Sequence, residues 1–465
     1  MVQISTPIDD LDSRIEQKLK KKTMQVSIFE GSFGVFSSVI ADNYIVPFSI
    51  SINSSPFQIG LLSSLGNLAA PIGQIIGSHQ IESNSRKSII IRGVAGLASM
   101  WPFFIAIALF YQFIFLQSFL PWLLIVIFLI YMLFGGTMTP SWFSVMGDVV
   151  PEGFRGRYFS KRNLINQSIA LIGIILLSFL LDWFDINSKV YFGFIVIFIL
   201  GFITRLVSIF LFTKHYYPPF IFEKTDHVKM GQFFKQISKS NFGKFTLFVC
   251  LLTFGQWIAK PFFSVYMLTY LNFNYSIFMI INLSSSLIGL LLFPLLGKFS
   301  DKFGNVRLIQ MGALIIPFLP FFWILYNTPL QIFLGIQILS GLAWTAFNLA
   351  TANFIFDNST SKMRGKYVAT YNFLIGLAII GGGLIGSIMV SYISISFMNS
   401  FHFIFLLSGI VRIIVVIGFL HKIKEVRVPS KPILNIKTLT FHKWLYDITL
   451  RSKYLRKKNR NKNRN

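Results

Sequence analysis

The sequence has few charged residues and a single cysteine. Asp, Glu, Lys and Arg make up 13% of the 465 residues, about half the share found in soluble globular chains, whereas 54% of the residues are hydrophobic. This composition, with a mean hydropathy of +0.65, excludes a soluble enzyme, a fibrous protein and a disordered chain. The lone Cys250 excludes a disulfide framework, and the six histidines form no ligand-like cluster, so we expect no metal site. A Walker motif is also missing, which excludes direct use of ATP, and we expect no cofactor.

The hydrophobic residues are gathered in twelve runs, each long enough to cross a bilayer as a helix of about 20 residues. The first 24 residues are polar and contain no short apolar core with a cleavage site, so they predict a retained tail rather than a signal peptide. The residues after 421 form a second polar tail, with 14 Lys or Arg against two acids. The predicted spans are 25–50, 56–78, 88–111, 119–146, 160–182, 190–213, 245–270, 275–297, 305–327, 329–356, 365–393 and 398–421.

Lys and Arg are concentrated in the loops on one side of these spans. Each loop after an even-numbered span contains at least two, for example Arg155–Arg162, whereas the loops after odd-numbered spans contain only Lys189. This bias predicts that the basic loops and both tails are cytoplasmic. It also accounts for the net charge of +25, so we expect the lipid bilayer and no nucleic acid as a partner. The sequence therefore predicts an all-α polytopic protein of the cell membrane.

The longest internal loop divides the chain into two sets of six spans. Its apolar residues suit an amphipathic helix on the membrane surface, and a solvated linker suits them equally well. The predicted parts are a cytoplasmic tail (1–24), a first six-helix half (25–213), a cytoplasmic loop (214–244), a second six-helix half (245–421) and a basic cytoplasmic tail (422–465).

A polar pattern recurs between the two halves. The sequence D-x6-RG-[RK]-Y-x4-N occurs twice, at an offset of 209. Each half also has one intramembrane arginine at a similar place, Arg205 and Arg412, at an offset of 207. Parallel six-helix repeats of this kind are found in transporters. The matched residues are Asp148, Arg155 and Gly156 in the first half, and Asp357, Arg364 and Gly365 in the second.

Residues 297–307 resemble the cytoplasmic motif G-x3-D-x2-G-x2-R of the major facilitator superfamily, through Gly297, Asp301, Gly304 and Arg307. The resemblance extends over residues 25–421 and implies twelve helices in two halves, with the solute held between them near mid-membrane. It also implies a cytoplasmic gate, in which Asp301 meets the helix that begins near Arg155. The corresponding loop in the first half departs from the motif, because Ile81 stands where the acid is expected.

Five ionisable residues lie inside the predicted spans, where each needs a partner or a wet cavity. The family resemblance places the first and seventh spans at the central cavity, which makes Glu30, Asp42 and Lys260 candidates for solute or proton binding. Asp42 and Lys260 are expected at similar depth and could pair; a structural ion pair, or acids reaching towards the interface, is the alternative. Arg205 and Arg412 lie on peripheral spans and are expected to be structural. Further polar candidates are Gln256, Asn348 and Asn372.

The pattern as a whole predicts a monomeric secondary active transporter, not an enzyme. It would move a small solute by alternating access, with protons as the coupling ion. One alternative is a polytopic membrane enzyme, which the short outer loops disfavour because they offer only Asp182 and Asp185. Another is a sensor or assembly factor on the same fold, which the departure at Ile81 alone supports. The identity of the solute is not encoded in any spacing.

Overall fold

The computed structural model describes residues 7–81, 83–111, 113, 116–151, 155–219, 240–358, 364–392 and 398–426. Within these ranges the chain consists of helices and their connections, without strands. Within the described part of the chain, twelve helices are long and apolar enough to cross a membrane, which confirms the predicted twelve-span, all-α fold. Most of the central loop, for which a surface helix and a solvated linker were equally expected, and most of the basic tail lie outside the described residues.

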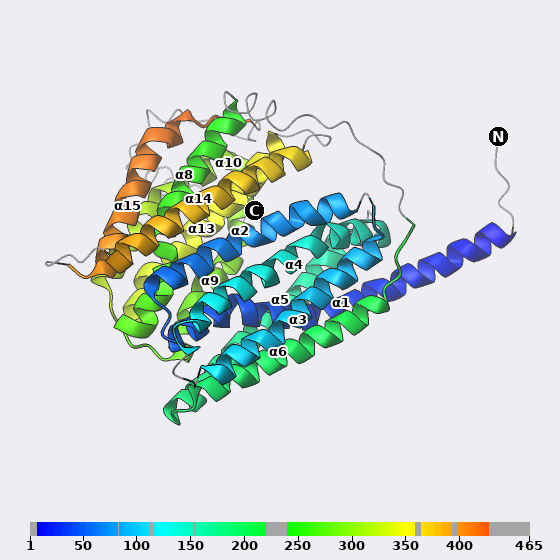
Figure 1. Ribbon diagram of the computed structural model, residues 1–465. Helices are drawn as coiled ribbons and strands as arrows, with labels where there is room; N and C mark the ends of the chain where they lie inside the picture. Colours follow the sequence, from blue (N-terminus) through cyan, green and yellow to red (C-terminus); the bar gives the residue numbers. More distant parts are fainter. Residues whose placement is uncertain are drawn as a thin grey trace, which may run out of the picture.

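Six long helices build the first half. The first of them starts well before the predicted span, since residues 7–24 are also helical. An ion pair between Lys20 and Glu16, one turn apart at 2.9 Å, supports these added turns. Figure 1 shows these turns projecting from the bundle. The helices are α1 (Pro7–Ser51), α2 (Pro56–Gln80), α3 (Arg86–Phe110), α4 (Leu120–Val149), α5 (Arg155–Ile186) and α6 (Val190–Thr213).

The second half also contains six spans, some of them interrupted by short 3-10 or π segments. One interruption coincides with Pro317, which has no N–H to continue the α-helical ladder. The elements are α8 (Asn241–Val265) with η3 (Tyr266–Tyr270), α9 (Tyr275–Phe303), α10 (Asn305–Ile315) with η4 (Ile316–Phe318) and α11 (Leu319–Leu325), α12 (Pro329–Gln331) with η5 (Ile332–Gln337) and α13 (Ile338–Asp357), α14 (Arg364–Tyr392), and α15 (Ser400–Phe419) with η6 (Leu420–Lys422).

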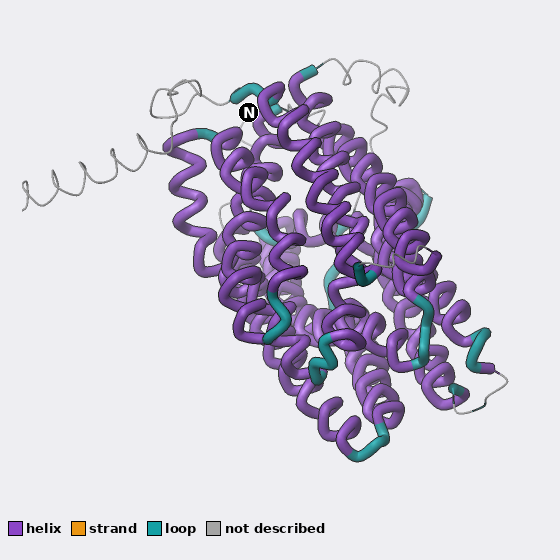
Figure 2. The backbone as a smooth tube through the Cα atoms, turned by 90° about the vertical axis from the view of Figure 1, so that its left-hand side faces the viewer, coloured by secondary structure: helices purple, strands orange, loops and turns teal. Residues whose placement is uncertain are grey.

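The two halves repeat the same packing. In the first, α1 packs on α5 and α6, and α2 and α3 pack on α4; in the second, α8 packs on α14 and α15, and α9 and α10 pack on α13. Both first spans are followed by an asparagine in the left-handed region, Asn53 (φ 54°) and Asn272 (φ 52°), a conformation that Asn tolerates well. Figure 2 shows the helices side by side, with connections at both ends of the bundle.

The halves meet through α2 with α14 and through α5 with α9. We call the end where α2, α4 and α6 finish the basic end, because the basic loops emerge there. Close contacts between α2 and α14 lie towards the opposite end, where Gly60 and Gly383 leave room for Ser387 and Ser64. Towards the basic end, side chains of the same two helices are exposed, among them Ile75. The two halves are therefore joined away from the basic loops.

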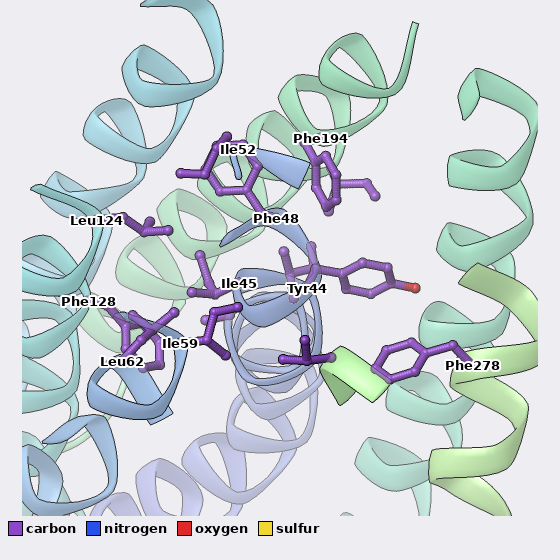
Figure 3. Close-up of a cluster of buried hydrophobic side chains, with 14 of the residues drawn as sticks. Tyr44, Ile45, Phe48, Ile52, Ile59, Leu62, Leu124, Phe128, Phe194 and Phe278 are labelled. Carbon is purple, nitrogen blue, oxygen red and sulfur yellow. The ribbon is translucent and has the colours of Figure 1, made fainter. Parts of the chain in front are cut away.

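A carboxylate also joins the halves at the opposite end. Asp182, near the end of α5, accepts hydrogen bonds from the backbone N–H groups of Tyr275 (2.7 Å) and Ser276 (3.1 Å), which begin α9. The first N–H groups of a helix have no partner within it, and a negative charge suits that terminus. The chain neighbours of this contact, Leu181 and Ile277, belong to or pack against a cluster of buried aromatic and aliphatic side chains. The cluster includes Tyr44 of α1 and Phe278 of α9 (Figure 3). Asp182 thus caps a helix of the other half beside an apolar cluster.

We expect Asp182→Asn to open this end more often, because it removes the charge that holds the α9 N–H groups. A hydrogen bond to a charged group contributes about 1.5–3 kcal/mol, so the open fraction should rise about tenfold or more. Ser64→Cys, in a Cys250→Ser background, reports opening through its rate of reaction with a hydrophilic thiol reagent, since Ser64 is fully buried. Asp185→Asn, an exposed acid on the same helix end, is the control. An unchanged rate in Asp182→Asn would show that the apolar cluster closes this end alone.

Candidate functional site

Glu30 is buried inside the first half, with 4% of its surface exposed. The Ser208 hydroxyl of α6 donates a hydrogen bond to its Oε1 (3.1 Å), and Arg162 Nη2 of α5 lies 3.6 Å from its Oε2. Oε2 has no hydrogen bond in the described structure. The carboxylate is therefore neutralised by an ion pair that is longer than a strong N–H···O contact of about 2.7–2.9 Å.

Arg162 is positioned by two other groups. Its Nε donates to the Ser27 carbonyl (3.2 Å), and its guanidinium carbon lies 4.7 Å from the centre of the Trp142 ring. The approach to α1 depends on Gly31, because a Cβ there would lie 2.8 Å from the Arg162 guanidinium carbon and 2.6 Å from Asn166 Nδ2. Sequence reasoning placed Arg162 among the basic loop charges and missed this contact. The one signal that could have identified it is its position at the start of a span, level with an acid on α1.

Arg205 ties α6 to α1 and α4. Its Nε donates to Ser37 Oγ (3.2 Å), and its Nη2 donates to Ser38 Oγ (2.9 Å) and the Tyr131 hydroxyl (3.3 Å). These bonds fit the structural role that its peripheral span suggested. The same guanidinium also lines the wall of the cavity that contains Glu30, so this arginine faces a candidate binding site.

The cavity has a volume of about 200 Å³ and is partly open. Its charged lining groups are Glu30, Arg162 and Arg205, and Ser38 and Thr139 add hydroxyl groups. Helices α1, α4, α5 and α6 all contribute, so the cavity lies within the first half. A volume of this size holds a small solute or several waters.

Asp42 lies on α1 one helical turn beyond Ser38, a residue of the cavity wall, and is not itself among the lining residues. It is exposed, and no hydrogen bond or ion pair joins it to a described residue. Lys260 of α8 is exposed as well, with its ammonium 4.5 Å from the centre of the Trp257 ring. Asp42 and Lys260, which the sequence placed at similar depth and made able to pair, form no ion pair among the described residues, because equal depth alone does not bring two side chains together.

The other candidates of the second half do not converge as those of the first half do. Buried Arg412 donates to backbone carbonyls of Ile316 (3.2 Å) and Gln256 (3.4 Å), and its Nε has no described partner. Asn348 on α13 and Asn372 on α14 are both exposed. No hydrogen bond joins Gln256, Asn348 and Asn372 to one another within the described residues.

Two of the predicted gate acids are bound within their own half. Asp148 pairs with buried Arg86 (2.5 Å), which also donates to the Pro218 carbonyl (2.7 Å). Asp357 accepts a hydrogen bond from Asn305 Nδ2 (2.7 Å). Each acid therefore fastens the end of its own helix, α4 or α13, to the start of the preceding span, α3 or α10.

The motif at 297–307 forms the turn between α9 and α10. Gly304 has φ 92°, a conformation that glycine adopts without strain, and Glu425 fills the space beside it. The carboxylate of Glu425 accepts a hydrogen bond from the Val306 N–H (2.7 Å). Gly297 meets no atom within 4 Å at its Cβ position, and Arg307 lies 5.8 Å from the centre of the Phe303 ring.

The other side of the predicted gate lies at the starts of α5 and α14. Arg155 and Gly156 begin α5, and Arg364 and Gly365 begin α14. Their side chains lie outside the described part of the chain, so the expected contact of Asp301 with Arg155 remains a prediction.

A comparison with protein families matches the description "Major Facilitator Superfamily" at residues 31–325 and 245–455. The chain belongs to this superfamily, as its motif and repeat indicated. Its fold is that of membrane transporters rather than of an enzyme. No curated protein sequence matches the chain.

Several solved structures share the fold at low sequence identity. An alanine mutant of the nucleoside transporter NupG is 12% identical, with a TM-score of 0.70, and the match covers 86% of this chain and all of that one. A POT family transporter in complex with 5-aminolevulinic acid is 12% identical, with a TM-score of 0.64 and coverage of 87% and 97%. A D-xylose-proton symporter is 16% identical, with a TM-score of 0.59 and coverage of 90% and 99%.

Gly31→Ala tests whether the close approach of α5 to α1 holds the site together. The added methyl group would displace Arg162 and Asn166, and overpacking of this kind costs about 1–3 kcal/mol. We expect a lower midpoint of thermal unfolding for the detergent-purified protein. Gly147→Ala on α4 is the control, because its Cβ position meets nothing within 4 Å and alanine favours a helix. Equal midpoints for both variants would contradict the predicted role of Gly31.

Proposed function

We propose that the chain is a secondary active transporter that moves a small solute by alternating access, with protons as the coupling ion. The observation that supports this best is a buried carboxylate, Glu30, at the wall of a cavity within a membrane span. An acid in this position is stable as a charged group only while it is paired. When its partner moves away, burial favours the neutral form, so the carboxylate takes up a proton. The D-xylose-proton symporter is a structural neighbour that couples to protons, which supports this choice of ion.

The arrangement of the halves supports a state that is open on the cytoplasmic side. We propose that the basic end is cytoplasmic and that both termini lie there, because of the one-sided distribution of Lys and Arg. The contacts that involve Asp182 and the α2–α14 glycines then close the outer side. Closing of the cytoplasmic side would bring Asp301 to the start of α5 near Arg155, as the family motif implies. We propose a monomer in the cell membrane, divided as the sequence analysis divides it.

The positions of the charged residues in the cavity restrict how proton binding can be coupled to solute binding. Glu30, Arg162 and Arg205 all belong to the first half, and their helices pack tightly on one another. Rocking of one half against the other leaves these three residues together. Protonation and solute binding must therefore be coupled through these same groups inside the cavity. Asp42 and Lys260, both exposed, are proposed to contact the solute from the two halves.

Glu30→Gln should abolish accumulation driven by a pH gradient while leaving downhill exchange largely intact, because the amide takes the place of the protonated acid and cannot release a proton. Purified protein in proteoliposomes, loaded with radiolabelled candidate solutes, measures both activities. Asp42→Asn is the matched comparison, since Asp42 lies three turns further along α1 without a bound arginine. If Glu30→Gln still concentrates solute with unchanged pH dependence, proton coupling through Glu30 is wrong.

A further inference from the structure

The charges that line the cavity do not balance. Two guanidinium groups, Arg162 and Arg205, face one carboxylate, Glu30. Arg205 uses its Nε and Nη2 on hydroxyl groups, and its Nη1 has no hydrogen-bond partner among the described residues. That Nη1 lies 3.7 Å from the position that a Cβ on Gly34 would occupy. The cavity therefore has a surplus positive charge and an unused donor where glycine leaves room.

We propose that this cavity binds a small oxyanion, a carboxylate or a phosphate group, between Arg162 and Arg205. This assignment deepens the proposed function, on which it rests for the transport step, because it makes the solute an anion. Guanidinium groups bind such oxygens with charge-assisted hydrogen bonds. The hydroxyl groups of Ser38 and Thr139 line the same wall and can donate to a bound oxygen once their present contacts rearrange.

The long contact between Glu30 and Arg162 explains how a proton assists the anion. At 3.6 Å the pair is held loosely, so a second anion can compete for Arg162. A proton added to Glu30 removes the competing charge and leaves both guanidinium groups to the incoming oxyanion. One proton and one singly charged anion then occupy the cavity together, without adding net charge to the membrane interior.

Among the charged and titratable groups near Glu30, Asp42 is a further acid, but it is not one of the residues that line the cavity, and Arg205 forms its described hydrogen bonds with hydroxyl groups instead. The remaining groups carry no negative charge that would offset the positive surplus. Burial and the charge of Arg162 lower the pKa of His215, just after α6, to about 4, so this histidine stays neutral. Tyr158 donates to the Met24 carbonyl, and Tyr217 donates to the Phe212 carbonyl. The groups around the site are Arg162 and Tyr158 from α5, Arg205 from α6, Tyr131 from α4, Asp42 from α1, and His215 and Tyr217 after α6.

Lys260 carries the same sign of charge in the second half. It lies within a membrane span, rests on the Trp257 ring, and has no acidic partner among the described residues. A cation in that position needs a counter-ion or water. An anionic solute would satisfy Lys260 as it passes between the halves, and this independent observation favours an anion over a neutral solute.

The test measures binding of acetate, inorganic phosphate and the neutral acetamide to the purified full-length protein by shifts in thermal stability over a concentration series. We expect acetate or phosphate, and not acetamide, to stabilise the wild type, more strongly at mildly acidic than at neutral pH. Glu30→Gln should bind the anion tightly at both pH values. Arg205→Gln should weaken binding about ten- to a hundred-fold, as expected for loss of a charged hydrogen bond, and Arg205→Lys should restore part of it.

A variant that leaves every charge in place separates loss of the binding site from misfolding caused by the removal of a charge. Gly34→Ala adds a methyl group between Glu30 and Arg205 and should weaken anion binding, whereas Gly418→Ala, with nothing within 4 Å, should not. Equal stabilisation by acetate and acetamide, or weaker anion binding in Glu30→Gln, would overturn the assignment. If the protein binds the anion but shows no gradient-driven uptake, the anion site is supported and the proposed transport function is wrong. If the protein shows gradient-driven uptake of a neutral solute but binds no anion, the proposed transport function is supported and the anion site is wrong.

Discussion

An ionised side chain inside a bilayer is stable only when a partner or water neutralises it. In the first half of this protein, the helices are packed so that the buried carboxylate of Glu30 has such partners. Glu30 of α1 is met by Arg162 of α5 and by Ser208 of α6. Arg205 of α6 is bound in turn to α1 and α4. Glycines on α1 let these groups approach. The same charges that fix the packing of four helices also line the cavity, so structure and proposed chemistry share one set of residues.

The rest of the molecule divides into contacts that hold each half and contacts that join the two. Arg86 with Asp148, and Asn305 with Asp357, fasten helices within a half near the basic end. Asp182 instead caps a helix of the other half at the opposite end. Rigid halves joined at one end are what alternating access requires, because the joint can then open while each half keeps its own packing. The proton and the solute would bias that joint from inside the first half.

Much of the fold follows from local features of the sequence, whereas the site depends on contacts between distant helices. Hydropathy and the motif at 297–307 predicted twelve spans and the family, because both signals are contained in short segments. Glu30 and Arg205 were recognisable because charges are rare in apolar runs. Arg162 was missed, since a basic residue at a span boundary resembles a topogenic charge. The pairing of Asp42 with Lys260 was expected from depth alone, and depth says nothing of the direction in which a side chain points.

The proposed proton coupling depends most on Glu30 exchanging Arg162 for a proton, and infrared difference spectroscopy can observe this exchange without a known solute. Acidifying a hydrated film of reconstituted protein should produce the C=O stretching band of a protonated carboxylic acid. The account predicts that this band includes a component that is lost in Glu30→Gln and kept in Asp42→Asn. A spectrum that is the same in wild type and Glu30→Gln across the whole acidification would contradict the account.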